Sequence, residues 1–299
     1  MMRHTRITWL AAFLALAVCF GCGAPSASPA KEMARGGIVT FGPNLTETAF
    51  ALGQGDRIVG VTSFCDYPPE AATKERLGGY LDPNLERIAM LRPSLLILPG
   101  RHEKLSDLAK QYNIPILNAH MDNMESIHKS IVDIGAALGC PDKADALWSG
   151  ITTELDAVRH SVENKPRLKV LLINTRTNHD LNNLFTVGKP SFLAELTAIA
   201  GGENIFNDVN EPYFEASKET IVMRAPDVIV EFHSGESLTP DQQAQYVADW
   251  NELPSLPAVK DKRVFLFMES YGLRPGPRIG LTAKKLAAML HPGVELATP

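Results

Sequence analysis

Apolar residues recur at helical spacing through the middle of the chain, between Pro141 and Lys165. They stand three or four positions apart, which places them on one face of a helix and leaves the opposite face polar. Because Pro141 favours a helix start and Pro166 a helix stop, the pattern predicts one long helix over residues 141–165. A crossover helix inside one domain would show the same periodicity, so the flanking chain has to decide. The apolar positions are Ala144, Leu147, Trp148, Ile151, Leu155, Val158 and Val162.

Short apolar runs alternate with helical stretches on the N-terminal side of this helix. Such alternation is typical of a parallel sheet covered on both faces. The sequence therefore predicts an N-terminal α/β lobe over residues 36–140. Its expected strands are 38–41, 57–61, 95–98 and 115–118, and its expected helices are 46–52, 84–91 and 103–111.

The pattern begins again after the long helix and predicts a C-terminal α/β lobe over residues 166–299. Two α/β lobes with parallel sheets, joined by one rigid helix, form a bilobed protein with a ligand cleft beyond the carboxyl ends of the strands. The expected strands here are 168–173, 227–232 and 263–267, and the expected helices are 191–200, 217–223, 241–250 and 278–290.

The second lobe repeats the first at an offset of 133 residues. The simpler alternative is that any cap, helix, proline and strand in succession look alike, but seven aligned features at one offset favour a true repeat. The offset places Tyr80 on Tyr213, Asn84 on Ser217, Glu86 on Glu219, Ile88 on Ile221, Met90 on Met223, Pro93 on Pro226 and Leu95-Leu96-Ile97 on Val228-Ile229-Val230.

Composition and motifs exclude several classes of function. The 299 residues include 29 Lys and Arg and 34 Asp and Glu, a net charge of -5, which offers no positive surface for nucleic acid. The chain has no G-x-S-x-G elbow, no P-loop and no HExxH motif, so no enzyme activity is expected.

The N-terminus predicts export. Arg3 and Arg6 precede an apolar run, Ile7 to Phe20, that is too short to span a bilayer comfortably and has the layout of a secretory signal. Residues 1–21 are therefore expected to be a signal peptide.

Gly21-Cys22 resembles the end of a bacterial lipoprotein signal, which makes Cys22 the expected lipid anchor. Cys19 is a competing site, but the bulky Val18 precedes it where a small residue is wanted. Plain cleavage to a free product is the other alternative. Residues 22–35, rich in Ala, Ser and Pro, then form a flexible tether, and the protein lies in the periplasm or on the outer face of the membrane.

Two other cysteines, Cys65 and Cys140, remain in the mature chain. A disulfide requires Cα atoms within about 7 Å, which a sequence cannot show. Pairing stays open, with two unpaired thiols preferred.

Aromatic residues stand near the carboxyl ends of the predicted strands. Flat side chains offered from two lobes suit a large, partly apolar ligand, although any one ring could instead pack in a core or loop. Arg274 could bind carboxylate, amide or phosphate groups on that ligand, while Arg278 is well placed to begin the last helix. The aromatic residues are Phe64, Tyr67, Tyr80, Phe185, Tyr213, Phe214 and Tyr271.

Four histidines each follow a predicted strand, which is the placement that a transition-metal site between lobes would use, with Glu269 as a carboxylate ligand. They lack any short ligand spacing, so no metal site is predicted. A divalent-metal receptor, or one histidine as axial ligand to a metal-containing macrocycle, remains an alternative. The histidines are His102, His120, His179 and His233.

Glu86 and Glu219 occupy the first turn of the two equivalent helices. An acid there complements the helix dipole, which is explanation enough for either one. Their identity at the repeat offset favours a second interpretation, a matched pair of docking charges for a two-lobed partner.

Four segments identify a family. They are Gly42 to Thr48, Gly60 to Pro69, Asn84 to Ile88 and Ala200 to Phe206. Through them the mature chain resembles, over nearly its whole length, the periplasmic cobalamin-binding proteins of ABC importers. These belong to a wider group that also captures ferric siderophores and haem.

The resemblance implies two Rossmann-like lobes on a stiff helix, a shallow cleft and little hinge closure. It implies that Phe64, Tyr80, Phe185, Tyr213 and Arg274 line a corrinoid site, and that Glu86 and Glu219 meet arginines of the permease. Tyr80 and Tyr213 stand where the family has tryptophan, and Phe64 replaces a tyrosine. Aromatic character survives, so a planar macrocycle still fits.

The sequence thus predicts a lipid-anchored, monomeric solute-binding protein that delivers cobalamin or a related corrinoid to an ABC permease dimer. The corrinoid is transported cargo and no cofactor is expected. A ferric siderophore or haem receptor of the same fold is the nearest alternative, followed by a divalent-metal receptor and then an exported enzyme.

Overall fold

Buried apolar strands build one sheet in each half of the chain, as the computed structural model of residues 37–294 shows. The signal peptide, Cys19, Cys22 and the tether lie outside the described residues. The N-terminal sheet is wholly parallel, with strand order β3-β2-β1-β4-β5. Its strands are β1 (Ile38–Thr40), β2 (Ile58–Val61), β3 (Glu75–Arg76), β4 (Leu95–Leu98) and β5 (Ile116–Asn118).

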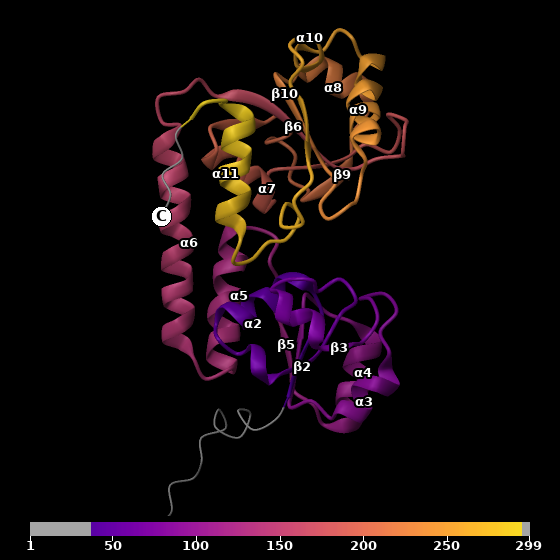
Figure 1. Ribbon diagram of the computed structural model, residues 1–299, viewed down its shortest axis with the longest axis vertical. Coiled ribbons are helices and arrows are strands. Elements are labelled where there is room, and N and C mark those ends of the chain that lie inside the picture. The colour runs from indigo at the N-terminus through magenta and orange to yellow at the C-terminus, as the bar shows by residue number, and fades with distance from the viewer. Residues whose placement is uncertain (1–36, 295–299) are drawn as a thin grey trace, which may run out of the picture.

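Helices cover this first sheet, as the alternating pattern predicted (Figure 1). One of them, α5, was not predicted. Asn123 begins it by accepting a hydrogen bond from the Ser126 backbone amide in a capping box, and Ile127, Ile131 and Ile134 are fully buried on one face. The helices are α2 (Pro43–Ala51), α3 (Leu85–Leu91), α4 (Glu103–Tyr112) and α5 (Met124–Ala137), with 3₁₀ turns η1 (Gly55–Arg57) and η2 (Pro69–Thr73).

The C-terminal sheet is mixed, which corrects the expectation of a second parallel sheet. Its order is β11-β10-β6-β7-β9, with β8 also paired to β6, and β7 is antiparallel to both β6 and β9. The segments at Phe185 and Tyr213 were not among the predicted strands. Each forms a three-residue strand, too short for a period-2 pattern to show in sequence. The strands are β6 (Leu168–Thr175), β7 (Phe185–Val187), β8 (Gly202–Asn204), β9 (Tyr213–Glu215), β10 (Val228–Phe232) and β11 (Val264–Phe267).

The helices of the second lobe follow the predicted positions to within two residues, apart from the unpredicted short α10. They are α7 (Phe192–Ile199), α8 (Lys218–Arg224), α9 (Pro240–Asp249), α10 (Pro257–Lys260) and α11 (Ile279–Leu290), with the 3₁₀ turn η3 (Trp250–Glu252).

One long helix, α6 (Pro141–Ser161), runs along both lobes (Figure 1). It packs against α5 in its first half and against α11 in its second. The predicted face is the packed one, since Ile151, Leu155 and Val158 are all buried. The helix ends four residues before the predicted boundary at 165, because residues after Ser161 turn toward β6.

The internal repeat is confirmed in three dimensions. Helices α3 and α8 begin and end at the same offset of 133 residues, capped by the side chains of Asn84 and Ser217. Each ends in a left-handed residue, Arg92 with φ 44° and Ala225 with φ 48°. Equivalent sequence features therefore produce equivalent local structure.

Two findings bear on export and redox state. Within residues 37–294, no helix is both long and apolar enough to cross a membrane. Cys65 is buried and Cys140 partly buried, and both are free thiols, which confirms the preferred interpretation.

Candidate ligand-binding cleft

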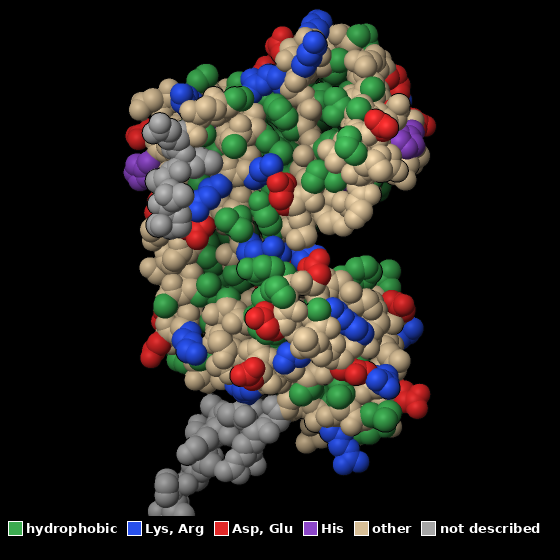
Figure 2. Space-filling view, in the orientation of Figure 1, with side chains coloured by type: hydrophobic (Ala, Val, Ile, Leu, Met, Phe, Trp, Pro, Cys, Tyr) green, Lys and Arg blue, Asp and Glu red, His purple; other side chains and the backbone are tan. Residues whose placement is uncertain are grey.

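The molecule is hollowed between its lobes, on the side away from α6 (Figure 2). Loops at the carboxyl ends of β1, β2 and β4 reach this hollow from the first lobe, where parallel strands place their binding loops. The hollow is therefore the candidate ligand site.

Phe185 and Tyr213 offer their rings from the second lobe. The register of β7 and β9 sets Val187 opposite Tyr213, so Phe185 and Tyr213 lie on one face of the sheet as diagonal neighbours. Their exposed fractions are 39% and 42%. Burial raises the pKa of Tyr213, and the carboxylate of Asp122 from the first lobe raises that pKa further. Tyr213 thus faces the opposite lobe.

Phe64 and Tyr80 offer rings from the first lobe. Phe64 is 68% exposed, which is unusual for an unpartnered phenylalanine. The Tyr80 hydroxyl donates to the Arg101 carbonyl at 3.3 Å, and its ring stands edge-on to His102. The His102 Nε2 donates to the Tyr80 carbonyl at 2.8 Å, so this histidine supports the tyrosine.

A recess of about 340 Å³ between the lobes, lined by both polar and apolar residues, contains two of the predicted ligand-binding residues, Phe64 and Arg274. Asn44 from the first lobe and Ser234 and Ser270 from the second also line it. The Ser234 hydroxyl is buried without a hydrogen-bond partner. A ligand group that donates or accepts a hydrogen bond would satisfy it.

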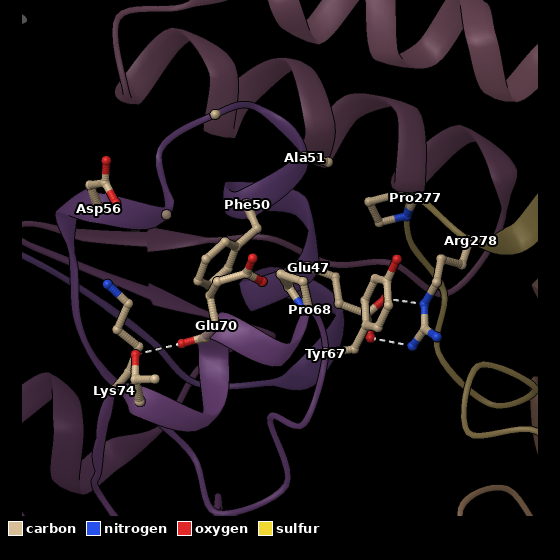
Figure 3. Close-up of a pocket in the computed structure, with 13 residues that line it drawn as sticks. Glu47, Phe50, Ala51, Asp56, Tyr67, Pro68, Glu70, Lys74, Pro277 and Arg278 are labelled. Carbon is tan, nitrogen blue, oxygen red and sulfur yellow. Dashed lines mark hydrogen bonds and ion pairs between the residues drawn. The ribbon is translucent and has the colours of Figure 1, made fainter.

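Arg274 belongs to a set of four charged side chains that we call the interlobe charge cluster, namely Glu47, Asp66, Arg274 and Arg278. Arg274 donates to both carboxylate oxygens of Asp66 and, at 3.3 Å, to Glu47. Arg278 donates twice to Glu47, at 2.8 and 2.5 Å. Figure 3 shows Glu47 and Arg278 pointing toward each other, with Tyr67 beside them. The cluster joins the lobes with two cations and two anions.

Aromatic rings enclose the cluster. The Arg278 guanidinium lies 4.1 Å from the ring centre of Tyr67 and 5.4 Å from that of Tyr271. Tyr271 is half-buried and also packs edge-on against Phe267. Its ring therefore packs within the second lobe, between β11 and the residue that precedes α11, whereas the rings of Phe64 and Phe185 are exposed.

A second recess, of about 700 Å³, borders the cluster at Glu47 and Arg278 (Figure 3). Phe50 and Lys74 line its other end. None of the residues predicted to bind ligand lines it.

Glu86 and Glu219 are exposed in the first turns of α3 and α8. Hydrogen bonds from its own backbone amide and from the Ser217 hydroxyl lower the pKa of Glu219, which is therefore a carboxylate at neutral pH. One turn further along each helix stands an exposed methionine, Met90 at 70% and Met223 at 78%. The repeat thus presents the same acid and apolar pair on both lobes.

The four histidines considered as metal ligands do not converge. Among residues 37–294, no group of three or more His, Cys, Asp or Glu side chains is arranged to hold a metal ion. Glu269 instead pairs with Lys285 at 2.7 Å. His179 is exposed, whereas His233 is buried between Glu231 and Glu236.

His233 marks a buried polar network that sequence reasoning missed. Glu231, with a side chain 1% exposed, accepts hydrogen bonds from Arg176 at 2.8 Å and from the Trp250 indole at 3.0 Å. Asp249 also pairs with Arg176, at 3.0 Å. A glutamate inside the apolar run of β10 was the available signal, because a charge in a buried strand requires a partner.

A family model described as periplasmic binding protein matches residues 38–271. The vitamin B12-binding protein of Pectobacterium carotovorum subsp. carotovorum is 27% identical over 257 residues, covering 85% of this chain and 87% of that protein. The periplasmic vitamin B12 binding protein BtuF of Vibrio cholerae gives a TM-score of 0.69 at 23% identity, covering 85% and 95% of the two chains. A periplasmic haem-binding protein from Pseudomonas aeruginosa gives 0.73 at 22% identity, covering 88% and 95%. These structures confirm the predicted fold class.

Proposed function

The chain belongs to the periplasmic binding protein family, and from that premise we propose that it captures cobalamin or a related corrinoid outside the cytoplasm and delivers it to an ABC permease. The family binds solutes, so the protein is a binding protein and not an enzyme. Its ligand is cargo that leaves again, not a cofactor.

The observation that carries the proposal is the set of accessible aromatic rings that both lobes present, of which Phe64, Phe185 and Tyr213 are exposed and Tyr80 is half-buried. Tyr80 and Tyr213 stand at equivalent positions of the repeat, and Phe64 and Phe185 add an exposed ring on each side. Rings of this kind suit a planar macrocycle with apolar faces. The vitamin B12-binding relative from Pectobacterium supports a corrinoid as that macrocycle.

Anchoring and delivery complete the proposal. A lipid on Cys22 would hold the protein at the outer face of the membrane, with residues 22–35 as the tether. Glu86 and Glu219 would meet basic residues of a permease dimer. The two-fold repeat of acid and methionine supports a two-fold partner, and a single copy of this chain already supplies both halves.

Calorimetric titration of residues 37–294 with cyanocobalamin tests the proposal. We expect saturable one-to-one binding at micromolar or tighter affinity, the range expected for a preformed site that buries a macrocycle. No binding heat from folded protein would contradict a corrinoid ligand.

Haem or a ferric siderophore is the second candidate for the same cleft. The haem-binding structure from Pseudomonas aeruginosa, with its TM-score of 0.73, favours it. The same titration with ferric haem separates the candidates, because tighter binding of haem than of cyanocobalamin would establish the alternative.

Replacing Tyr80 or Tyr213 with Ala is expected to weaken cobalamin binding by about tenfold each, because each loses the contact of one ring with the macrocycle. Tyr112→Ala is the matched control, since Tyr112 is 49% exposed on α4 and lies outside the cleft. Titration of the three variants measures the effect. If Tyr80→Ala and Tyr213→Ala bind cobalamin as tightly as the control Tyr112→Ala, neither Tyr80 nor Tyr213 belongs to the site.

A further inference from the structure

Arg274 is the one cation among the described residues that line this recess of the cleft, and two carboxylates already neutralise its charge. Both oxygens of the Asp66 carboxylate accept from its guanidinium, and Glu47 accepts a further hydrogen bond. If Asp66 lost its charge, Glu47 could not neutralise Arg274 in its place, because both carboxylate oxygens of Glu47 already accept hydrogen bonds from Arg278, at 2.8 and 2.5 Å. Asp66 therefore cancels the charge that Arg274 would present to a ligand.

We propose that Asp66 determines specificity, by making this cleft select a macrocycle edged with uncharged carboxamides over one that carries carboxylates. The inference rests on the proposed function and names the substrate class of the same site. Corrinoids bear carboxamide side chains, whereas haem bears two propionates. Because Asp66 cancels the charge of Arg274, the site offers no net positive charge to a propionate but can still hydrogen-bond a carboxamide.

The rest of the recess suits an amide edge. Asn44, Ser234 and Ser270 are neutral groups that can both donate and accept hydrogen bonds. The buried Ser234 hydroxyl has no hydrogen-bond partner, so a hydrogen bond from it to a carboxamide would replace no existing one. No free cation stands among the described residues of this recess to attract a propionate.

A carboxylate entering the recess would meet Asp66 across the guanidinium. Arg274 holds the pKa of Asp66 below its ordinary value through their hydrogen bond, so Asp66 keeps its negative charge at neutral pH. The ligand would have to displace this carboxylate or lie beside a like charge, and both weaken binding. An uncharged amide meets neither obstacle.

The test compares wild-type protein with Asp66→Asn, a substitution that keeps the size of the side chain and an oxygen acceptor for Arg274 while removing the charge. Asp66 is 57% exposed, so the variant is expected to fold. We expect it to bind ferric haem about tenfold more tightly than wild type, because Asp66 no longer cancels the positive charge of Arg274, which can then attract a propionate. Affinity for cyanocobalamin should change by less than about threefold, since an amide does not compete with Asp66. Unchanged haem affinity in Asp66→Asn would overturn the proposal.

Asp122→Asn is the matched control. It removes one negative charge near the cleft, beside Tyr213, but leaves Arg274 paired with Asp66. An equal gain in haem affinity in this control would show that net charge alone sets the preference and would overturn the role of Asp66.

A second ligand pair removes the difference between corrin and porphyrin. Cobalamin monocarboxylic acids, in which one side-chain amide is hydrolysed, should bind wild type more weakly than cobalamin does for at least one isomer, and Asp66→Asn should reduce that difference. No isomer-dependent loss in wild type would overturn the proposal.

The two hypotheses fail separately. If wild type binds no cyanocobalamin, the proposed function fails, and the haem titrations of wild type and Asp66→Asn still decide whether Asp66 blocks Arg274. If wild type binds ferric haem as tightly as cyanocobalamin, selection against carboxylates is overturned while a macrocycle receptor stands.

Discussion

Replacing Glu231 with Ala is expected to lower the free energy of unfolding by about 3–5 kcal/mol, the usual cost of removing one partner from a buried ion pair. The Arg176 side chain is 1% exposed, so without Glu231 its charge stays buried with Asp249 as its remaining carboxylate partner. The indole of Trp250, itself fully buried, loses its acceptor as well. Thermal unfolding should show a midpoint lower by about 6–20 °C.

Glu236→Ala is the control for this prediction. Glu236 also pairs with His233, but its side chain is 54% exposed, so its removal should cost less than about 1 kcal/mol. Glu231→Gln should fall between the two, because the amide keeps an acceptor for Arg176 but not the charge. A Glu231→Ala midpoint equal to that of wild type would mean that the network contributes little to stability.

The same network makes the free energy of unfolding depend on pH, and the pKa of His233 gives the direction of that dependence. Burial lowers the pKa of His233, but the carboxylates of Glu231 and Glu236 more than offset this, so the pKa lies above its ordinary value. Because this pKa is raised in the folded state, protonated His233 stabilises the fold, and this stabilisation is fully present below the ordinary pKa of histidine, about 6.5. It is lost as pH rises through the pKa of the folded protein.

Local patterns made part of this structure predictable. Helices α3 and α8 could be placed from sequence because cap, apolar centre and following strand all recur at one offset, so each lobe supports the assignment of the other. Helix α6 was visible because 21 residues hold one apolar face, long enough for periodicity to be unambiguous. The aromatic residues were placed beside these elements on the same grounds, and their part in ligand binding stays a prediction.

Tertiary contacts explain what the sequence could not show. Asp66 and Arg274 are 208 residues apart, and nothing in the local pattern of either one indicates the other. The sequence therefore presented Arg274 as a free ligand-binding cation, whereas the fold pairs it with two carboxylates. The strands β7 and β9 were missed for a related reason, since three residues gain their strand geometry from pairing with a distant segment.

Reversing the charge at both Glu86 and Glu219 to Lys is expected to lower cobalamin uptake by a factor on the order of a hundred or more, while the affinity of the isolated protein for cobalamin stays unchanged. Each glutamate stands exposed on a helix that carries none of the proposed ligand-binding residues. Two lysines would meet the basic residues proposed on the permease and repel them. The measurement is uptake of labelled cyanocobalamin by cells that express the variant with its permease, beside titration of the purified variant.

The repeat makes the single variants informative as well. Because Glu86 and Glu219 occupy equivalent first turns, each single reversal should leave one lobe able to dock and should reduce uptake less than the double variant does. Glu103→Lys is the matched control, since Glu103 is also an exposed acid in a first turn, that of α4, but the residue at the repeat offset, Glu236, does not stand on a helix. Full uptake by the double variant, or an equal loss in Glu103→Lys, would contradict docking through the paired acids. Loss of uptake in the double variant, with uptake by Glu103→Lys unchanged, would mean that the two repeated lobes together form a two-fold docking surface for a two-fold partner.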